Sequence, residues 1–371
     1  MSSQATRRQV VRAGLGLLGA AAVTSAPLRA GAGSRHDFAG QEIRWILPFM
    51  PGGGSDIWAR FNAPFLERHL AGHPTVSVVT EPGGGSTRGA NLYAQTARPD
   101  GLSVFGTSGS TQFPWLLGDQ RVRYDYRDWL ALMVAPTGGV VSVVPGLGVE
   151  SWRDVARLAG QRLVFASQGP TSLDLVPMLA FRVLGLDVRY VFGFTGRGPG
   201  LAAAARGEAS IDYQTTASFL RNVAPMVAEG RMIPVMSWGV VDAQGRVVRD
   251  PTFPELPTVE EVHQTLHGRP PEGRDYDAYR IFATAGFGAQ KMMVLPRETP
   301  PEIIATWREG WAAVFADPEY QASVSDVLGR YEQVSGDAAL ALYDMATRID
   351  PGLRSYVLEL LASEYAVRVG D

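Results

Sequence analysis

The chain has 371 residues, enough for two domains, and its 46% hydrophobic and 19% charged residues are typical of a globular protein. A net charge of −3 gives no support for nucleic-acid binding or for electrostatic attachment to a membrane. The absence of cysteine excludes disulfides, thiolate catalysis, cysteine-ligated zinc and a lipid-modified cysteine.

The first 33 residues are typical of an export signal. Arg7 and Arg8 precede an apolar stretch at 10–23, and small residues at 30–32 offer a cleavage site. The paired arginines predict the twin-arginine route, with an ordinary secretory signal as the alternative. The apolar stretch is too short and too rich in Gly and Ala for a membrane span. We therefore expect a periplasmic protein that is not lipid-anchored.

A strand, a glycine loop and a helix start then follow one another. The strand covers 43–47, the loop contains Gly52–Gly54, and Ser55 or Asp56 can cap the helix. Glycine allows φ of either sign and a close backbone approach, so the loop can aim free N–H groups at an anion. Because no Gly-Lys-Ser/Thr ending follows, we expect a small carboxylate rather than a triphosphate. An ordinary glycine-rich turn is the alternative.

The same alternation continues along the chain and predicts mostly parallel sheets. A strand at 76–79 and a glycine loop at 83–86 lead into a helix over 87–97, and a strand at 102–105 leads into a loop at 106–110. An apolar strand at 140–144 is expected to cross between domains. Ser151 and Asp154 then predict a capped helix. The next expected elements are a strand at 163–166, a helix at 172–184, a strand at 188–192, a helix at 199–206 and a strand at 210–214.

The last third is less regular. Residues 239–278 are rich in Pro, Gly and charge and are interpreted as surface loops. Arg280–Thr284 is expected to be the strand that returns to the first domain. Thr299 is expected to cap a helix that buries two tryptophans, and a final helix at 337–363 should be interrupted at Pro351.

Eight short motifs in this order resemble one family. The first three are Pro48-Phe49 with Gly52-Gly53 and Asp56, a Pro-Gly-Gly turn at 82–85, and Pro99-Asp100-Gly101. The others lie at 163–172, 194–199, 207–212 and 254–261, and Asp317-Pro318 follows near the C-terminus. Together they resemble the solute-binding proteins of tripartite tricarboxylate transporters, the Bug family. The family's Tyr-Lys pair is Phe194-Thr195 here, and segments near 239–250 and 265–278 resemble insertions.

The resemblance implies an α/β fold of the two-lobed type II periplasmic-binding (Venus flytrap) kind, with two chain crossings. Lobe 1 would comprise 41–141 and 283–371, and lobe 2 would comprise 142–282. The family is non-enzymatic, so the resemblance implies a monomeric receptor that captures a di-, tri- or aromatic carboxylate and delivers it to membrane permease subunits. It implies no cofactor and no metal.

Ligands of open α/β sheets bind beyond the carboxyl ends of the strands. By resemblance, the first loop and the Ala-Ser-x-Gly loop hold the carboxylate through backbone N–H groups and ordered waters. Arg197 is the one obvious cation of these loops, and Asp56 is expected to be a cap more than a contact. The expected ligand-binding residues are Phe49, Met50, Pro51, Gly52, Gly53, Gly54, Ser55, Asp56, Thr107, Ser108, Ser167, Gln168, Gly169, Thr171, Ser172, Arg197 and Gln214.

No catalytic or metal-binding set is found. The sequence lacks Gly-x-Ser-x-Gly and His-Glu-x-x-His, and the spaced pairs His69/His73 and His263/His267 are flanked by Gly and Pro. Three hypotheses therefore stay open: a transport receptor, the same receptor serving a sensor, and a secreted α/β enzyme such as a hydrolase or transferase. A nucleophile paired with a base in the cleft would favour the enzyme.

Overall fold

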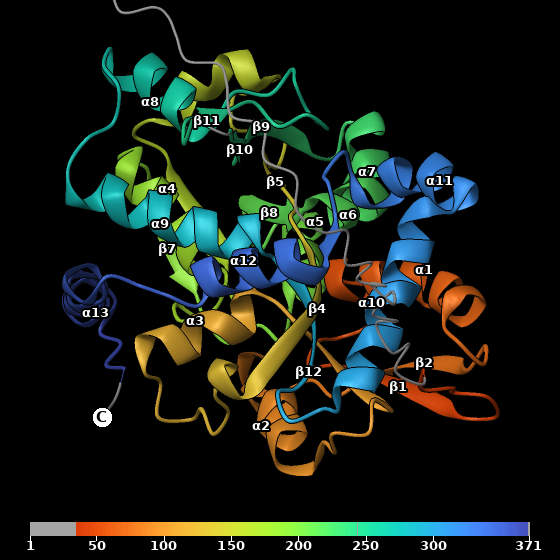
Figure 1. Ribbon diagram of the computed structural model, residues 1–371. Coiled ribbons are helices and arrows are strands. Elements are labelled where there is room, and N and C mark those ends of the chain that lie inside the picture. Colours follow the sequence, from red (N-terminus) through yellow and green to blue (C-terminus); the bar gives the residue numbers. More distant parts are fainter. Residues whose placement is uncertain (1–34, 243, 370–371) are drawn as a thin grey trace, which may run out of the picture. The chain divides into compact units, whose positions relative to one another are not determined.

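The computed structural model describes residues 35–242 and 244–369, and the predicted export signal lies outside them. Its first sheet has six strands in the order β13-β4-β12-β3-β1-β2 (Figure 1). β1 pairs in parallel with β2 and β3, whereas β12 runs antiparallel to β3 and β4. The strands are β1 (Glu42–Leu47), β2 (Thr75–Thr80), β3 (Ser103–Thr107), β4 (Trp129–Ala135), β12 (Lys291–Pro296) and β13 (Val334–Ser335).

The second sheet has five strands in the order β7-β6-β8-β5-β9. β6 pairs in parallel with β7 and β8, and β5 runs antiparallel to β8 and β9. Its strands are β5 (Gly139–Val143), β6 (Arg162–Ala166), β7 (Asp187–Val191), β8 (Ile211–Thr215) and β9 (Ile233–Ser237). The four strands expected at 140–144, 163–166, 188–192 and 210–214 are thus confirmed to within a residue or two.

Helices connect the strands of both sheets. Helix α1 begins at Gly54, directly after the glycine loop that follows β1. Helix α10 packs beside α1 (Figure 1). The helices are α1 (Gly54–His69), α2 (Thr87–Thr96), α3 (Gly109–Leu117), α4 (Leu175–Val183), α5 (Arg197–Ala205), α6 (Thr216–Ser218), α7 (Ala224–Ala228), α8 (Val259–His267), α9 (Arg274–Gly288), α10 (Pro301–Ala316), α11 (Pro318–Leu328), α12 (Gly336–Ala346) and α13 (Pro351–Tyr365). No helix within the described ranges is long and apolar enough to cross a membrane.

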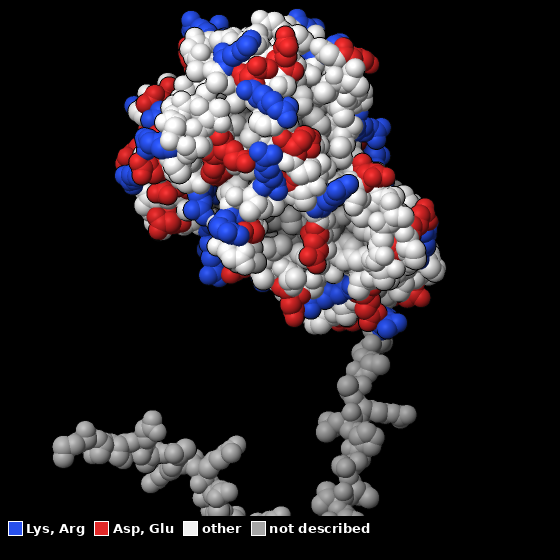
Figure 2. Space-filling view, turned by 90° about the horizontal axis from the view of Figure 1, so that it is seen from above, with Lys and Arg blue, Asp and Glu red and all other residues white. Residues whose placement is uncertain are grey.

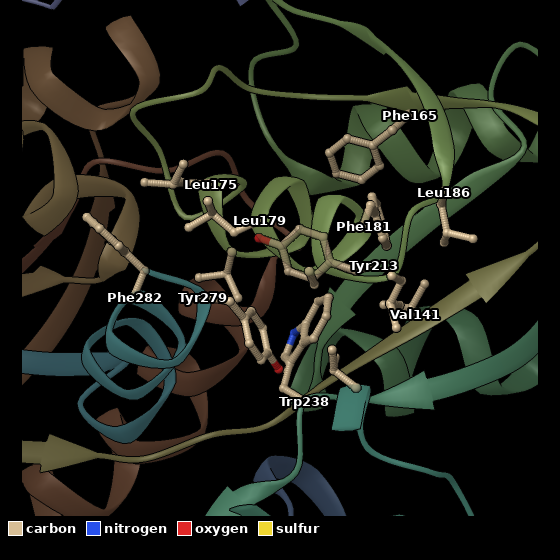
Figure 3. Packing of buried hydrophobic residues seen from close by; sticks show 14 of the residues in the cluster. Val141, Phe165, Leu175, Leu179, Phe181, Leu186, Tyr213, Trp238, Tyr279 and Phe282 are labelled. Carbon is tan, nitrogen blue, oxygen red and sulfur yellow. The ribbon is translucent and has the colours of Figure 1, made fainter. Parts of the chain in front are cut away.

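Each sheet has its own apolar core. Around the first sheet, Trp307 and Trp311 of α10 are fully buried, as expected for the tryptophan pair. In the second core, the ring of Tyr213 from β8 faces Trp238 with centroids 5.7 Å apart, and Tyr279 of α9 lies beside them (Figure 3). These aromatic rings bury large apolar areas and fix how α9 packs on the second sheet.

The chain crosses between the sheets after β4 and again before β12. The first crossing is at 136–138, and the strand expected to cross between domains, 140–144, lies within the second sheet as β5. The prediction of a returning strand at Arg280–Thr284 is wrong, because these residues lie inside α9. Their short apolar run suits either a strand or a helix, and Phe282 packs edge-on against Phe113 in the second core. The return to the first sheet comes later, between Gly288 and Lys291.

Two further expectations need correction. Residues 239–278 are not all loop: they contain a two-stranded hairpin, β10 (Val240–Val241) and β11 (Val247–Val248), and helix α8, which Thr258 caps. Thr299 does not cap α10, whose N-cap is Pro300; its hydroxyl donates to the carbonyl of Pro296 instead. The expected break of the last helix at Pro351 is confirmed, since α13 begins there.

Candidate functional site

A cavity lies where the loops of the two sheets meet. The first sheet contributes the glycine loop and the start of α1, the start of α3, and the first residue of β12. The second contributes the loop after β6, the turn before α5 and the end of β8. The lining residues are Phe49, Met50, Pro51, Gly53, Gly54, Ser55, Ser108, Ser110, Gln168, Leu173, Thr195, Gly196, Arg197, Gly198, Pro199, Tyr213, Gln214, Thr215, Gln290 and Lys291.

The glycine loop is ordered by its own backbone and by Asp56. Gly52 has φ +82°, which favours glycine, whereas Gly53 is extended with φ −81° and is the N-cap of α1. The expectation that Ser55 or Asp56 is the cap is therefore wrong. Asp56, in the first turn, accepts the N–H of Gly52 at 2.9 Å and pairs with Arg60 at 2.8 Å. The first N–H groups of α1 have no acceptor within the helix, so they favour an anion in the cavity.

Arg197 lines the cavity, but its charge is used within the protein. Its guanidinium lies 3.2 Å from Asp174 and pairs with Asp212, and it donates to two backbone carbonyls. It also stacks over the rings of Phe165 and Tyr213. Burial opposes the charge, yet the two carboxylates raise the pKa of Arg197 above its ordinary value. Burial likewise raises the pKa of Asp212 to about 6, against the pull of Arg197. Arg197, the one obvious cation of the predicted binding loops, thus lines the cavity while its guanidinium is paired with Asp174 and Asp212.

The other basic side chain that lines the cavity is Lys291, which forms no ion pair with a carboxylate of the described residues. Its side chain is buried, its Nζ donates to Ser55 Oγ at 2.9 Å, and it lines the cavity beside Gly54. Burial lowers the pKa of Lys291 to about 7. Sequence reasoning missed this residue, because it looked for lysine only near the loop in sequence. The feature of the sequence that could have identified it is that Lys291 is the only lysine among the 371 residues.

Most of the other expected residues line this cavity, but seven do not. Gly52 and Asp56 bond to each other behind the loop. Thr107 is fully buried against the Tyr126 hydroxyl, and Ser167 donates to Asp174 at 3.0 Å. The remaining three, Gly169, Thr171 and Ser172, line a neighbouring cavity.

This neighbouring cavity is bounded by the second glycine loop. Gly84 and Gly85 line it from the first sheet, and Gln168 is shared with the main cavity. Arg121, which also lines it, is paired with Asp119 at 2.5 Å and donates to Thr171. The second loop therefore borders the region between the sheets without reaching the main cavity.

The described residues offer no metal site. Within 35–242 and 244–369, no three His, Cys, Asp or Glu side chains are grouped so that they could hold an ion. His69 contacts Asp317 at 2.7 Å, and His263 contacts the carbonyl of Arg269 at 2.7 Å. At least one histidine of each spaced pair is thus held by a hydrogen bond within the fold.

Comparison with known proteins finds a sequence relative and solved structures of the same fold. No family model matches it. A UPF0065 protein from the tcbD-tcbE intergenic region of Pseudomonas sp. (strain P51) is 28% identical over 268 residues, which cover 69% of this chain and 71% of the relative. The chain is a homologue of this UPF0065 protein.

Solved structures show the same fold. The periplasmic binding protein BugD matches with a TM-score of 0.64 and 18% identity, covering 85% of this chain and 96% of BugD. MatC from Rhodopseudomonas palustris, solved with malate, matches with a TM-score of 0.61 and 18% identity over 85% of this chain and 98% of MatC. A second R. palustris protein, solved with adipate, matches with a TM-score of 0.65 and 18% identity, covering 87% of this chain and 98% of that protein. The fold is therefore the periplasmic-binding fold of BugD and MatC, as the motifs predict.

Proposed function

We propose that this chain is a periplasmic receptor that binds a small carboxylate between its two sheets and delivers it to a tripartite tricarboxylate-type membrane transporter. The observation that carries the proposal is the meeting of loops from both sheets around the start of α1 and Lys291. A helix N-terminus and a buried amine both favour a negative charge, and the other polar groups of the cavity are neutral hydroxyls and amides apart from the internally paired Arg197.

The ligands seen in proteins of the same fold support this choice. MatC was solved with malate and a second R. palustris protein with adipate, both carboxylic acids. Basic and acidic side chains are interspersed over the face shown in Figure 2, without a broad patch of one sign. Such a surface offers no electrostatic footprint for a nucleic acid.

A thermal-shift screen with a panel of carboxylic acids tests the proposal. A ligand that binds only the folded state raises the unfolding temperature, so malate, adipate, citrate and benzoate are suitable first probes. Small-angle scattering should then show a smaller radius of gyration with the bound acid, because the loops that grip it come from both sheets. Failure of every acid to bind would contradict the proposal.

The enzyme alternative is decided by the same samples. Ser55 and Lys291 are within hydrogen-bond distance, which is also the spacing of a serine–lysine nucleophile pair. We expect the acid to be recovered unchanged after prolonged incubation, and we expect no hydrolysis of p-nitrophenyl esters. Turnover that is lost in Ser55→Ala would replace the receptor with a hydrolase.

Delivery and export are further parts of the proposal. Arg7→Lys together with Arg8→Lys should leave unprocessed precursor in the cytoplasm of a bacterium that uses the twin-arginine route. Normal processing of this double variant would leave the ordinary secretory route.

Delivery to a transporter is tested genetically. Deletion of adjacent permease genes should abolish uptake of the bound acid, whereas loss of a sensory response alone would favour the sensor alternative.

A further inference from the structure

Lys291 occupies an unusual position for a lysine. It begins β12, which lies between β3 and β4 inside the first sheet, and its side chain is only 5% exposed. Its amine reaches the first turn of α1, where it donates to Ser55 Oγ at 2.9 Å. A lysine can be removed from water in this way only at a large cost in solvation, unless a negative charge compensates it.

The described structure supplies no such negative charge. The main cavity and a small hollow behind Lys291 are lined by no Asp or Glu side chain. Asp56, one residue after Ser55, is held by Gly52 and Arg60. The amine is thus buried with one neutral hydroxyl partner.

The other titratable groups around the amine have hydrogen-bond or ion-pair partners of their own. Besides Lys291, those lining the two spaces are Arg197, Tyr213 and Tyr331. Tyr331 donates to Asp250 at 2.6 Å, and Tyr213 contacts Asp174 at 3.1 Å. Arg197 is paired with Asp174 and Asp212, and the amine of Lys291 donates to Ser55 Oγ instead of to either carboxylate.

We infer that Lys291 is the cation that pairs with the ligand's carboxylate, and that the protein takes up a proton onto its amine when this acid binds. The inference rests on the proposed carboxylate-binding function and adds the group that recognises the charge. Without ligand, burial lowers the pKa of Lys291 to about 7, so much of the amine is neutral above that pH. A carboxylate beside the amine stabilises the ammonium form and restores the proton.

Calorimetry measures this proton directly. Titration of malate, adipate, citrate and benzoate at pH 8, in two buffers with different ionisation enthalpies, should reveal uptake of most of one proton for an acid that binds. The uptake should fall toward zero at pH 5.5, where the amine is already charged. Lys291→Met should lose at least tenfold in affinity together with all proton uptake. Ser55→Ala is the matched control, since it removes the neutral partner, keeps the charge and should still take up the proton.

The single lysine also permits a spectroscopic test. Incorporation of lysine labelled with ¹³C at Cε gives one side-chain signal in the whole chain, whose shift with pH reports the amine. Its midpoint should lie near neutrality in the free protein and rise on saturation with the acid. A midpoint above 10 in the free protein, or an acid that binds Lys291→Met as tightly as wild type without proton uptake, would overturn the inference while leaving the receptor function intact. Binding of no acid would overturn both.

Discussion

Gly54, at the start of α1, lies directly against the side chain of Thr215 at the end of β8, so that the two sheets meet at this point. A Cβ atom at Gly54 would overlap Thr215 Oγ1 and would lie 3.5 Å from Thr215 Cβ. Gly54 is therefore required by close approach and not by its backbone angles. This contact lies at the edge of the cavity, so substitutions at it test whether the two sheets must approach each other to bind a ligand.

Gly54→Ala should weaken binding of the carboxylic acid at least tenfold, because the added methyl group pushes Thr215 away and holds the cavity open. Thr215→Ala on the same background removes the overlapping hydroxyl and should restore most of the affinity. The measurement is isothermal titration, with the radius of gyration in the presence of ligand as a second reading.

Gly53→Ala is the matched control for this series. Gly53 has φ −81°, and a Cβ atom there would meet only the carbonyl of Met50 at 3.8 Å, so the substitution should be tolerated. Equal losses in Gly53→Ala and Gly54→Ala would show that the loop is sensitive to any side chain and would contradict the role of the Thr215 contact.

Arg197→Met should destabilise the protein by about 3–5 kcal/mol, because it leaves Asp174 and Asp212 buried without their shared cation. Arg206→Met is the control, since Arg206 forms an exposed pair with Glu208 and its loss should leave the free energy of unfolding nearly unchanged. Urea unfolding of both variants provides the comparison. If Arg197→Met lost as little free energy of unfolding as the control, the ion pairs of Arg197 with Asp174 and Asp212 would add little to stability.

Lys291→Met should change how the stability of the ligand-free protein depends on pH. The folded-state pKa of about 7 lies below the ordinary value of 10.5, so between these values the unfolded chain binds a proton that the folded chain does not. Wild-type stability should therefore rise with pH across this window, relative to the variant, by up to about 1.4 kcal/mol per pH unit. Below pH 7 both states carry the proton and the difference should be constant.

Denaturant unfolding of both proteins at pH 6, 7, 8 and 9 measures this difference. All other titrating groups are shared, so subtraction of the two curves isolates Lys291. Parallel curves over the whole range would show that the amine keeps its proton in the folded state and finds a partner there.

Local patterns in the sequence were sufficient for much of the fold. The apolar run before Pro48, the glycines after it and the helix that follows are decided by neighbours in the chain, and β1 and α1 lie where these patterns predict them. The periplasmic-binding fold was implied by the resemblance of the ordered motifs to the Bug family, and solved structures of that fold match the chain. Where a short apolar run suits both a helix and a strand, as at Arg280–Thr284, the packing of Phe282 in the second core favours the helix.

The charges of the site were decided by tertiary structure alone. Arg197 lies in a predicted binding loop, but strands β6 and β8 place its guanidinium between aromatic rings and beside two carboxylates that neutralise it. Lys291 lies 236 residues from Ser55, and only the insertion of β12 between β3 and β4 brings its amine to the start of α1. Whether a charge is free depends on burial and on partners distant in sequence, and these are properties of the folded chain.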